Sequence, residues 1–290
     1  MGAQVNAGPI VSRSIKVRNV STKPVASGYL PVGDLQMYHE VYGEGNPLVL
    51  LHGAFSAIGT SFGKLIPGLA EKRQVIGLEM QAHGRTADID RPLTLEALAD
   101  DVAVVLDHLG LENADLFGYS TGGSVALHAT LRHPEKVRKL VMASVGYTLG
   151  GIHPGLMDGL GEMEPEMMFG SPWHDEYLEI APRPEDFATL FAKKAEMDRG
   201  IKDFAPETIE TIESPVLLII GDSDLITLEH AVEFFRLLGG GVFGDTPAGL
   251  AASRLAILPG TSHVTMVNQT DLIVPMVNSF LDAEVPSISG

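Results

Sequence analysis

Residues 114–122 read Ala-Asp-Leu-Phe-Gly-Tyr-Ser-Thr-Gly and join two contrasting stretches of the chain. The first four residues are short and apolar enough for a buried strand, whereas residues 123–129 are a good start for a helix. The last five match the pattern Gly-x-Ser-x-Gly. At a strand-to-helix junction this pattern predicts a turn so tight that small residues must flank the serine. The hydroxyl of Ser120 is then pushed out above the sheet edge as a nucleophile.

Strands and helices alternate on both sides of this turn. Thr94 is the predicted N-cap of the clearest helix, 94–109, whose leucines and valines share one face at a period of 3.6 residues. Further helices are expected at 228–238 and about 271–281. The expected strands are 48–51, 74–78, 139–143, 216–220 and 255–258. This alternation predicts an α/β fold with a mostly parallel, doubly wound sheet that helices cover on both faces.

The N-terminal edge of this sheet is expected to be antiparallel. Strands predicted at 29–32 and 36–42 are joined by Gly33-Asp34, a pair that favours a tight hairpin turn. Residues 1–28 before them are polar and mixed in composition. We expect them to form a loosely docked N-terminal lead-in.

Residues 146–212 break the alternation of strands and helices. They contain no convincing strand, six prolines interrupt them, and their helical pieces are short and amphipathic. An all-helical insertion in an α/β chain is best explained as a cap over the functional edge of the sheet. The predicted organisation is therefore a core of residues 29–145 and 213–290 with a helical cap at 146–212.

The composition excludes several classes of function. The formal net charge of −17 makes nucleic acid and anionic membrane surfaces unsuitable partners. Because the chain has no cysteine, disulfides, thiolate catalysis and cysteine-based metal sites are excluded. No uncharged apolar run approaches the roughly 18 residues that a membrane span needs, and residues 1–28 lack the apolar core of a secretory signal. We expect a cytoplasmic monomer or homodimer that acts on a small molecule.

A serine hydroxyl is a poor nucleophile at neutral pH. Ser120 therefore needs a base within hydrogen-bond reach and an acid that orients the base. In a parallel sheet, both should lie in loops that follow the carboxyl ends of strands. One such loop carries Asp222 and Asp224, and another ends in His263. The chain order is Ser, Asp, His, and both aspartates are candidates at this point.

Four separated motifs give residues 29–282 a resemblance to a known family. They are His52-Gly53, Gly118-Tyr119-Ser120-Thr121-Gly122, Gly221-Asp222-Ser223-Asp224 and the stretch 260–263. In this order they resemble the α/β-hydrolase superfamily, in the group of serine esterases with a helical cap. The resemblance implies that Ser120 is the nucleophile, that His263 is the general base and then the acid, and that Asp224 orients His263. Asp224 is favoured over Asp222 because the family's acid usually stands three residues after the glycine.

The resemblance also implies an oxyanion hole made of two backbone N–H groups. One would come from Thr121, and the other from Ala54, with Phe55 as the less favoured choice. His52 and His83 are interpreted as histidines that organise their loops. No histidine stands at a metal-ligand spacing, so we predict no metal and no cofactor.

The insertion carries residues expected to select the substrate. Five of the eleven methionines lie there, together with the only tryptophan. Flexible methionines and an aromatic ring suit a pocket for a bulky apolar group. Their alternative role is to dock the short helices onto the core. The candidate pocket residues are Phe55, Tyr119, Met157, Met168 and Trp173.

The leading interpretation is a hydrolase of carboxylic esters, lactones among them, that works through an acyl-enzyme. The same triad could instead cleave carbon–carbon bonds or, as a perhydrolase or haloperoxidase, make peracids. A ligand-binding, receptor-like protein on the same scaffold is a third candidate. Epoxide hydrolases and haloalkane dehalogenases resemble this fold but use a carboxylate nucleophile, and the serine at position 120 argues against them.

Overall fold

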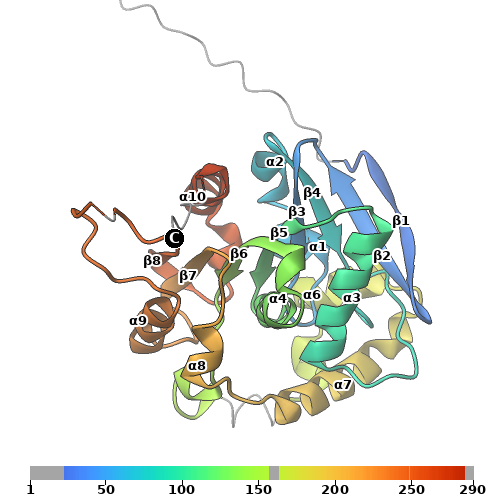
Figure 1. The fold of residues 1–290 in the computed structure, drawn as a ribbon. Coiled ribbons are helices and arrows are strands. Elements are labelled where there is room, and N and C mark those ends of the chain that lie inside the picture. Colours follow the sequence, from blue (N-terminus) through green and yellow to red (C-terminus); the bar gives the residue numbers. More distant parts are fainter. Residues whose placement is uncertain (1–22, 157–162, 248, 285–290) are drawn as a thin grey trace, which may run out of the picture.

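The computed structural model describes residues 23–156, 163–247 and 249–284, and its centre is an eight-stranded sheet (Figure 1). The spatial order of the strands is β1-β2-β4-β3-β5-β6-β7-β8. β2 is antiparallel to both of its neighbours, β1 and β4, and the other neighbouring pairs are parallel. The strands are β1 Ala26–Val32, β2 Leu35–Tyr42, β3 Asn46–Leu51, β4 Arg73–Leu78, β5 Ala114–Tyr119, β6 Val137–Ala143, β7 Val216–Ser223 and β8 Arg254–Ser262.

The strand order reverses beside β3. The chain leaves β3 outward to β4 and then returns to β5, on the other side of β3. The loops that follow β3 and β5 therefore start at the carboxyl ends of neighbouring parallel strands and diverge, which is where open α/β sheets bind ligands. His52 follows β3 and Ser120 follows β5, so the predicted nucleophile stands at this switch point.

Helices cover both faces of the sheet. One face packs against α1 (Ile58–Phe62), α2 (Ile66–Leu69) and α10 (Thr270–Asp282), and the other against α3 (Leu95–His108), α4 (Thr121–Arg132) and α9 (Leu228–Leu237). Side chains of each strand alternate between the two cores. In β3, Leu48 and Leu50 join the first core, and Val49 and Leu51 join the second. None of the described helices is long and apolar enough to cross a membrane.

The described residues between β6 and β7 form helices joined by loops, with one isolated β-bridge between Ile152 and Ile226. The two main helices are α6 (Pro172–Ile180) and α7 (Phe187–Gly200). Ser171 caps α6, because its hydroxyl accepts a hydrogen bond from the His174 N–H at 3.3 Å. The shorter elements are η2 Leu149–Gly151, η3 Pro165–Met168, η4 Pro184–Asp186 and α8 Pro206–Ile209. α7 has 14 residues, so it is longer than the short pieces that the sequence predicts.

The predicted fold class, a mostly parallel doubly wound sheet with an antiparallel N-terminal edge and a helical insertion, is confirmed. Differences lie at the ends of strands. β1 begins at Ala26, inside the predicted lead-in of residues 1–28. β8 continues to Ser262, where Pro259 and Gly260 predict a loop. The reason is pairing across the sheet: Ser262 stands opposite Ser223 of β7 after a shift in register, and local sequence does not reveal such a partner.

Thr94 supports α3 as the sequence predicts, since its side chain accepts a hydrogen bond from the Ala97 N–H at 3.1 Å. Replacing Thr94 by Ala should lower the free energy of unfolding by about 1 kcal/mol, because that N–H loses its partner. Thr94→Ser keeps the oxygen and should remain close to wild type. Urea denaturation of the three proteins measures the difference, and equal midpoints for all three would contradict the assignment.

Candidate active site

Ser120 occupies a sharp turn between β5 and α4. Its backbone lies at φ 54° and ψ −123°, a region that non-glycine residues rarely adopt. A Cβ at Gly122 would lie 2.0 Å from the Leu51 carbonyl oxygen, and a Cβ at Gly118 would lie 2.2 Å from the Gly122 carbonyl oxygen. Side chains are thus excluded on both sides of the serine. This is the physical reason for the Gly-x-Ser-x-Gly pattern at this junction.

His263 reaches Ser120 from the loop after β8. Its Nε2 lies 3.0 Å from the Ser120 Oγ, and its Nδ1 lies 3.0 Å from the Asp224 Oδ1. Because an ionised carboxylate can only accept, the Nδ1 carries the ring proton and the Nε2 is free to accept from the serine hydroxyl. The Tyr119 hydroxyl donates to the His263 carbonyl at 2.8 Å and ties the loop to the end of β5.

Asp224 is held as a buried anion at the end of β7. Its side chain is 0% exposed and accepts hydrogen bonds from the Ser144 hydroxyl (2.5 Å), the Gly221 N–H (3.1 Å) and the Leu225 N–H (2.7 Å). Burial opposes the charge, but the hydrogen bonds from His263 and Ser144 outweigh it, and the pKa of Asp224 lies below its usual value. The carboxylate therefore stays ionised at neutral pH beside the imidazole.

Asp222, the competing acid, has a different role in the structure. Its carboxylate accepts hydrogen bonds from the Gly260 N–H at 2.8 Å and the Thr261 N–H at 3.1 Å. It thereby fastens the end of β8 to the end of β7. The carboxylate that contacts His263 belongs to Asp224, and this contact supports the prediction that Asp224 orients His263.

The loop after β3 passes beside Ser120, the predicted nucleophile. A Cβ at Gly53 would lie 3.5 Å from the Ser120 Cβ, so the backbone of this loop is close to the serine. Ala54, Thr121 and Ser120 line the same cavity. Phe55 has a positive φ of 58°, and its ring stacks on Phe191 of α7 at 4.9 Å between centroids. The N–H groups of Ala54 and Thr121 remain our prediction for the oxyanion hole.

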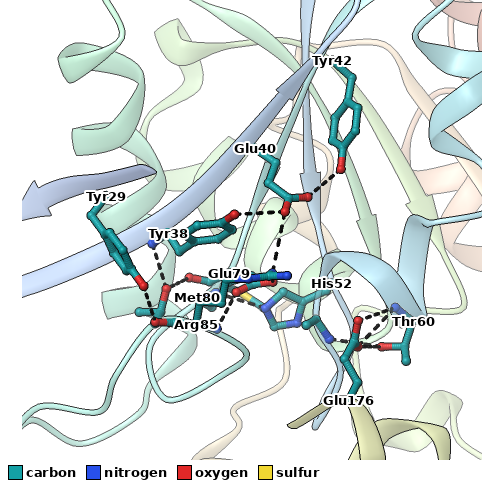
Figure 2. Close-up of polar contacts among 12 residues, drawn as sticks. Tyr29, Tyr38, Glu40, Tyr42, His52, Thr60, Glu79, Met80, Arg85 and Glu176 are labelled. Atoms are coloured by element: carbon teal, nitrogen blue, oxygen red, sulfur yellow. Dashed lines mark hydrogen bonds and ion pairs between the residues drawn. The ribbon is translucent and has the colours of Figure 1, made fainter. Parts of the chain in front are cut away.

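His52 and His83 lie behind this loop and are fully buried. The His52 Nε2 accepts from the Met80 N–H at 3.0 Å (Figure 2), and its Nδ1–H donates to the Gly53 carbonyl at 2.8 Å. Burial lowers the pKa of His52 to about 4, and that of His83 to about 3, so both rings are neutral. Their contacts suit the loop-organising interpretation. The described residues contain no group of three or more His, Asp or Glu side chains that could hold a metal ion.

Two cavities meet at Ser120. Cavity A has a volume of about 260 Å³, lies against the insertion and is mainly apolar. Cavity B has a volume of about 160 Å³ and lies between α4 and the chain that follows β6. Cavity A is lined by Phe55, Tyr119, Met163, Met168, Trp173 and Phe191. Cavity B is lined by Leu127, His128, Val145, Tyr147, Ile152 and Phe204. Four of the five predicted pocket residues thus line cavity A, and Met157 lies outside the described residues.

An ion pair on α7 stands where the two cavities join. Lys194 and Asp198 are one helical turn apart, and both line cavity A and cavity B. The Lys194 Nζ lies 2.5 and 2.6 Å from the two carboxylate oxygens, and the lysine side chain is only 9% exposed. The pair presents a donor and an acceptor beside Ser120. The i, i+4 spacing is visible in the sequence, but nothing local shows that this helix faces the serine.

Ser144 is a second residue that sequence reasoning missed. It follows β6 and has a positive φ of 58°, and its hydroxyl donates a hydrogen bond to the Asp224 carboxylate. Its position at the carboxyl end of a predicted parallel strand was the available signal, since Asp224 and His263 were found by the same rule.

Comparison with known proteins places this geometry in context. A family model described as "alpha/beta hydrolase fold" matches residues 46–243. A 2-hydroxymuconate semialdehyde hydrolase from Pseudomonas sp. strain CF600 is 38% identical, over 85% of this chain and 91% of that protein. A pimeloyl-[acyl-carrier protein] methyl ester esterase from Neisseria meningitidis is 26% identical, over 83% of this chain and 78% of the other.

A similar fold is found among solved structures. A meta-cleavage product hydrolase from Pseudomonas fluorescens IP01 superimposes with a TM-score of 0.66, covering 90% of this chain and 98% of that one. The two sequences are 19% identical, so the likeness concerns the fold.

The two aspartates make a matched pair for testing the site. Asp224→Asn keeps the shape but removes the charge that orients His263, and should slow labelling of Ser120 by a fluorophosphonate probe by roughly 10³–10⁴-fold. Asp222→Asn alters only the joint between β7 and β8 and should keep most of the rate. Intact-protein mass spectrometry follows the labelling. Equal losses in the two variants would contradict the geometry.

Proposed function

The chain belongs to the alpha/beta hydrolase fold family, and on that premise we propose that it is a serine hydrolase of carboxylic esters, lactones included. The proposed substrates are small and largely apolar. The observation that carries the proposal is the hydrogen-bonded chain from Ser120 through His263 to Asp224, placed where two cavities meet. We assign these residues as nucleophile, general base and orienting acid.

The first step forms an acyl-enzyme. The Ser120 Oγ attacks the ester carbonyl carbon while its proton passes to the His263 Nε2, 3.0 Å away. Asp224 stabilises the imidazolium that results, because its carboxylate accepts from the Nδ1–H. The tetrahedral intermediate then collapses, and His263 returns the proton to the alcohol oxygen as the carbon–oxygen bond breaks.

The negative oxygen of the intermediate needs donors that are already in place. We assign the backbone N–H groups of Ala54 and Thr121, which line cavity A beside Ser120. One such donor is worth about 3–4 kcal/mol of transition-state stabilisation. Thr121 is also the first residue of α4, so the positive end of this helix dipole lies close to the same oxygen.

Water completes the cycle. It attacks the acyl-enzyme carbonyl while His263 takes its proton, and collapse of the second intermediate returns that proton to the Ser120 Oγ. The products are a carboxylic acid and an alcohol, and the enzyme is restored without a cofactor or metal.

The two cavities suit the two halves of an ester. The acyl group and the alcohol group extend to opposite sides of the scissile bond, and Ser120 lies between cavity A and cavity B. We propose that residues 146–212 form a cap on a core of 29–145 and 213–290. In support, Trp173 and Phe191 of this segment face the same cavity as Ser120.

Loss of the nucleophile tests this function directly. Ser120→Ala should reduce the hydrolysis of short p-nitrophenyl esters to the background rate, because no acyl-enzyme can form. Release of p-nitrophenol at 405 nm is the measurement, with Ser279→Ala, an exposed serine on α10 that lines neither cavity, as the control. Undiminished turnover by the Ser120 variant would refute the proposal.

A carbon–carbon hydrolase is the second candidate. It is favoured by the 38% identity to the semialdehyde hydrolase and by the Lys194–Asp198 pair, which offers a donor and an acceptor to a polyfunctional substrate. The same triad would act on a ketone or aldehyde carbonyl whose neighbouring carbon leaves as a stabilised carbanion. Water would supply the hydroxyl group of the acid product and the proton that the carbanion takes up.

A substrate panel separates the two candidates. For the wild-type protein we expect kcat/KM for p-nitrophenyl butyrate to exceed that for 2-hydroxymuconate semialdehyde, whose loss is followed by its visible absorbance. Ser120→Ala should abolish whichever activity is enzymatic. A higher kcat/KM for the semialdehyde would assign the site to carbon–carbon cleavage.

A further inference from the structure

Glu176 links the helical insertion to the core at one defined point. It lies on α6, and its carboxylate accepts hydrogen bonds from the Thr60 N–H at 3.2 Å and from the Thr60 hydroxyl (Figure 2). Thr60 lies in α1, the short helix that begins immediately after the loop of residues 53–57. The two residues are 116 positions apart in the chain. The contact therefore joins the insertion to the segment that carries Ala54.

Thr60 connects Glu176 to the loop of residues 53–57 through a further hydrogen bond. The Thr60 hydroxyl oxygen accepts from the Ala57 N–H at 3.2 Å while its proton is donated to Glu176. The next residue, Ser61, accepts from the Gly53 N–H at 3.2 Å. α1 thus holds the first and last residues of the 53–57 loop. The Ala54 N–H lies between these two fixed points.

The Glu176 carboxylate packs closely against α1. A Cβ at Gly59 would lie 2.2 Å from the Glu176 Oε1. A second contact joins the insertion to the same loop, because the Phe55 ring stacks on Phe191 of α7. Glu176 itself is not among the residues that line cavity A or cavity B, whereas Trp173 of the same helix lines cavity A.

We propose that Glu176 is a positioning residue for the oxyanion hole, acting through Thr60 on the backbone of Ala54. This rests on the proposed function, in which the Ala54 N–H stabilises the negative oxygen of the intermediate. Two residues of α6 then have different roles. Trp173 contacts the substrate, and Glu176 fixes the donor loop, so transition-state stabilisation is complete only when the insertion is docked over cavity A.

This arrangement predicts that loss of Glu176 lowers kcat much more than it changes KM. A small displacement of a donor weakens its hydrogen bond to the transition state, where charge develops, more than it weakens ground-state binding. Because Glu176 does not line either cavity, its loss leaves the walls that bind the ester in place. A residue that only stabilises the fold would instead lower the amount of folded enzyme.

The test compares Glu176→Ala and Glu176→Gln with Glu179→Ala, an exposed glutamate on the same helix. Glu176→Ala should lower kcat for p-nitrophenyl butyrate by about 10- to 100-fold with little change in KM. Glu176→Gln should recover most of the loss, because an amide oxygen still accepts from Thr60. Glu179→Ala should match wild type. Thermal midpoints of all proteins identify any variant that fails to fold.

Fluorophosphonate labelling of Ser120 gives a second readout that needs no substrate, since the phosphoryl oxygen enters the same hole. If wild type cleaves no ester yet is labelled, the proposed function fails, and the labelling rates of the Glu176 variants still test the positioning role. A Glu176→Ala variant that is folded and both cleaves esters and labels at the wild-type rate would overturn the inference alone. So would a variant that raises KM and leaves kcat unchanged.

Discussion

The contact on which this site depends is the approach of the Gly122 backbone to the carbonyl oxygen of Leu51. It brings the end of β5 and the start of α4 against the end of β3, at the point where the strand order reverses. Ser120 is forced into a positive φ by this turn, and its hydroxyl points into space that neighbouring loops can reach. Any side chain at position 122 would separate the nucleophile from the loop that carries Ala54.

The sequence identifies the candidate catalytic residues at this edge of the sheet more completely than the residues that surround them. Ser120, Asp224 and His263 all follow parallel strands, and parallel strands end at one edge, so chain position alone brings them together. Their catalytic roles and the oxyanion donors remain predictions, and the distances from His263 to Ser120 and Asp224 suit the predicted triad. The fold class followed from alternation and is confirmed, whereas the position of β4 outside β3 depends on a pairing between distant segments.

Apart from Ser144, the residues that sequence reasoning missed lie on the insertion, and their contacts depend on how the insertion docks. Lys194, Asp198 and Glu176 resemble ordinary surface charges on amphipathic helices. In the structure the first two form a partly buried pair beside Ser120, and the third bonds to α1. Local periodicity identifies a helix and its apolar stripe, but it does not say which polar side chain will meet a distant backbone.

The sheet and the insertion contribute different parts of the candidate site. The carboxyl edge of the sheet sets the distances among Ser120, His263 and Asp224. α6 and α7 contribute Trp173, Phe191 and Ala195 to the apolar wall of cavity A, together with the Lys194–Asp198 ion pair. The charges of Lys194 and Asp198 thus balance each other in the wall of cavity A, in a chain whose net charge is −17.

The close approach of Glu176 to Gly59 limits which residues related proteins can carry at these two positions. Because the Glu176 carboxylate occupies the volume of a Cβ at position 59, a side chain at 59 is compatible with this contact only if the carboxylate turns away from its present place. An alanine at 59 would therefore displace the end of the Glu176 side chain and weaken the link between the insertion and α1. Among homologues, an acid that contacts α1 from position 176 should occur with glycine at 59, whereas glycine at 59 can persist without the acid.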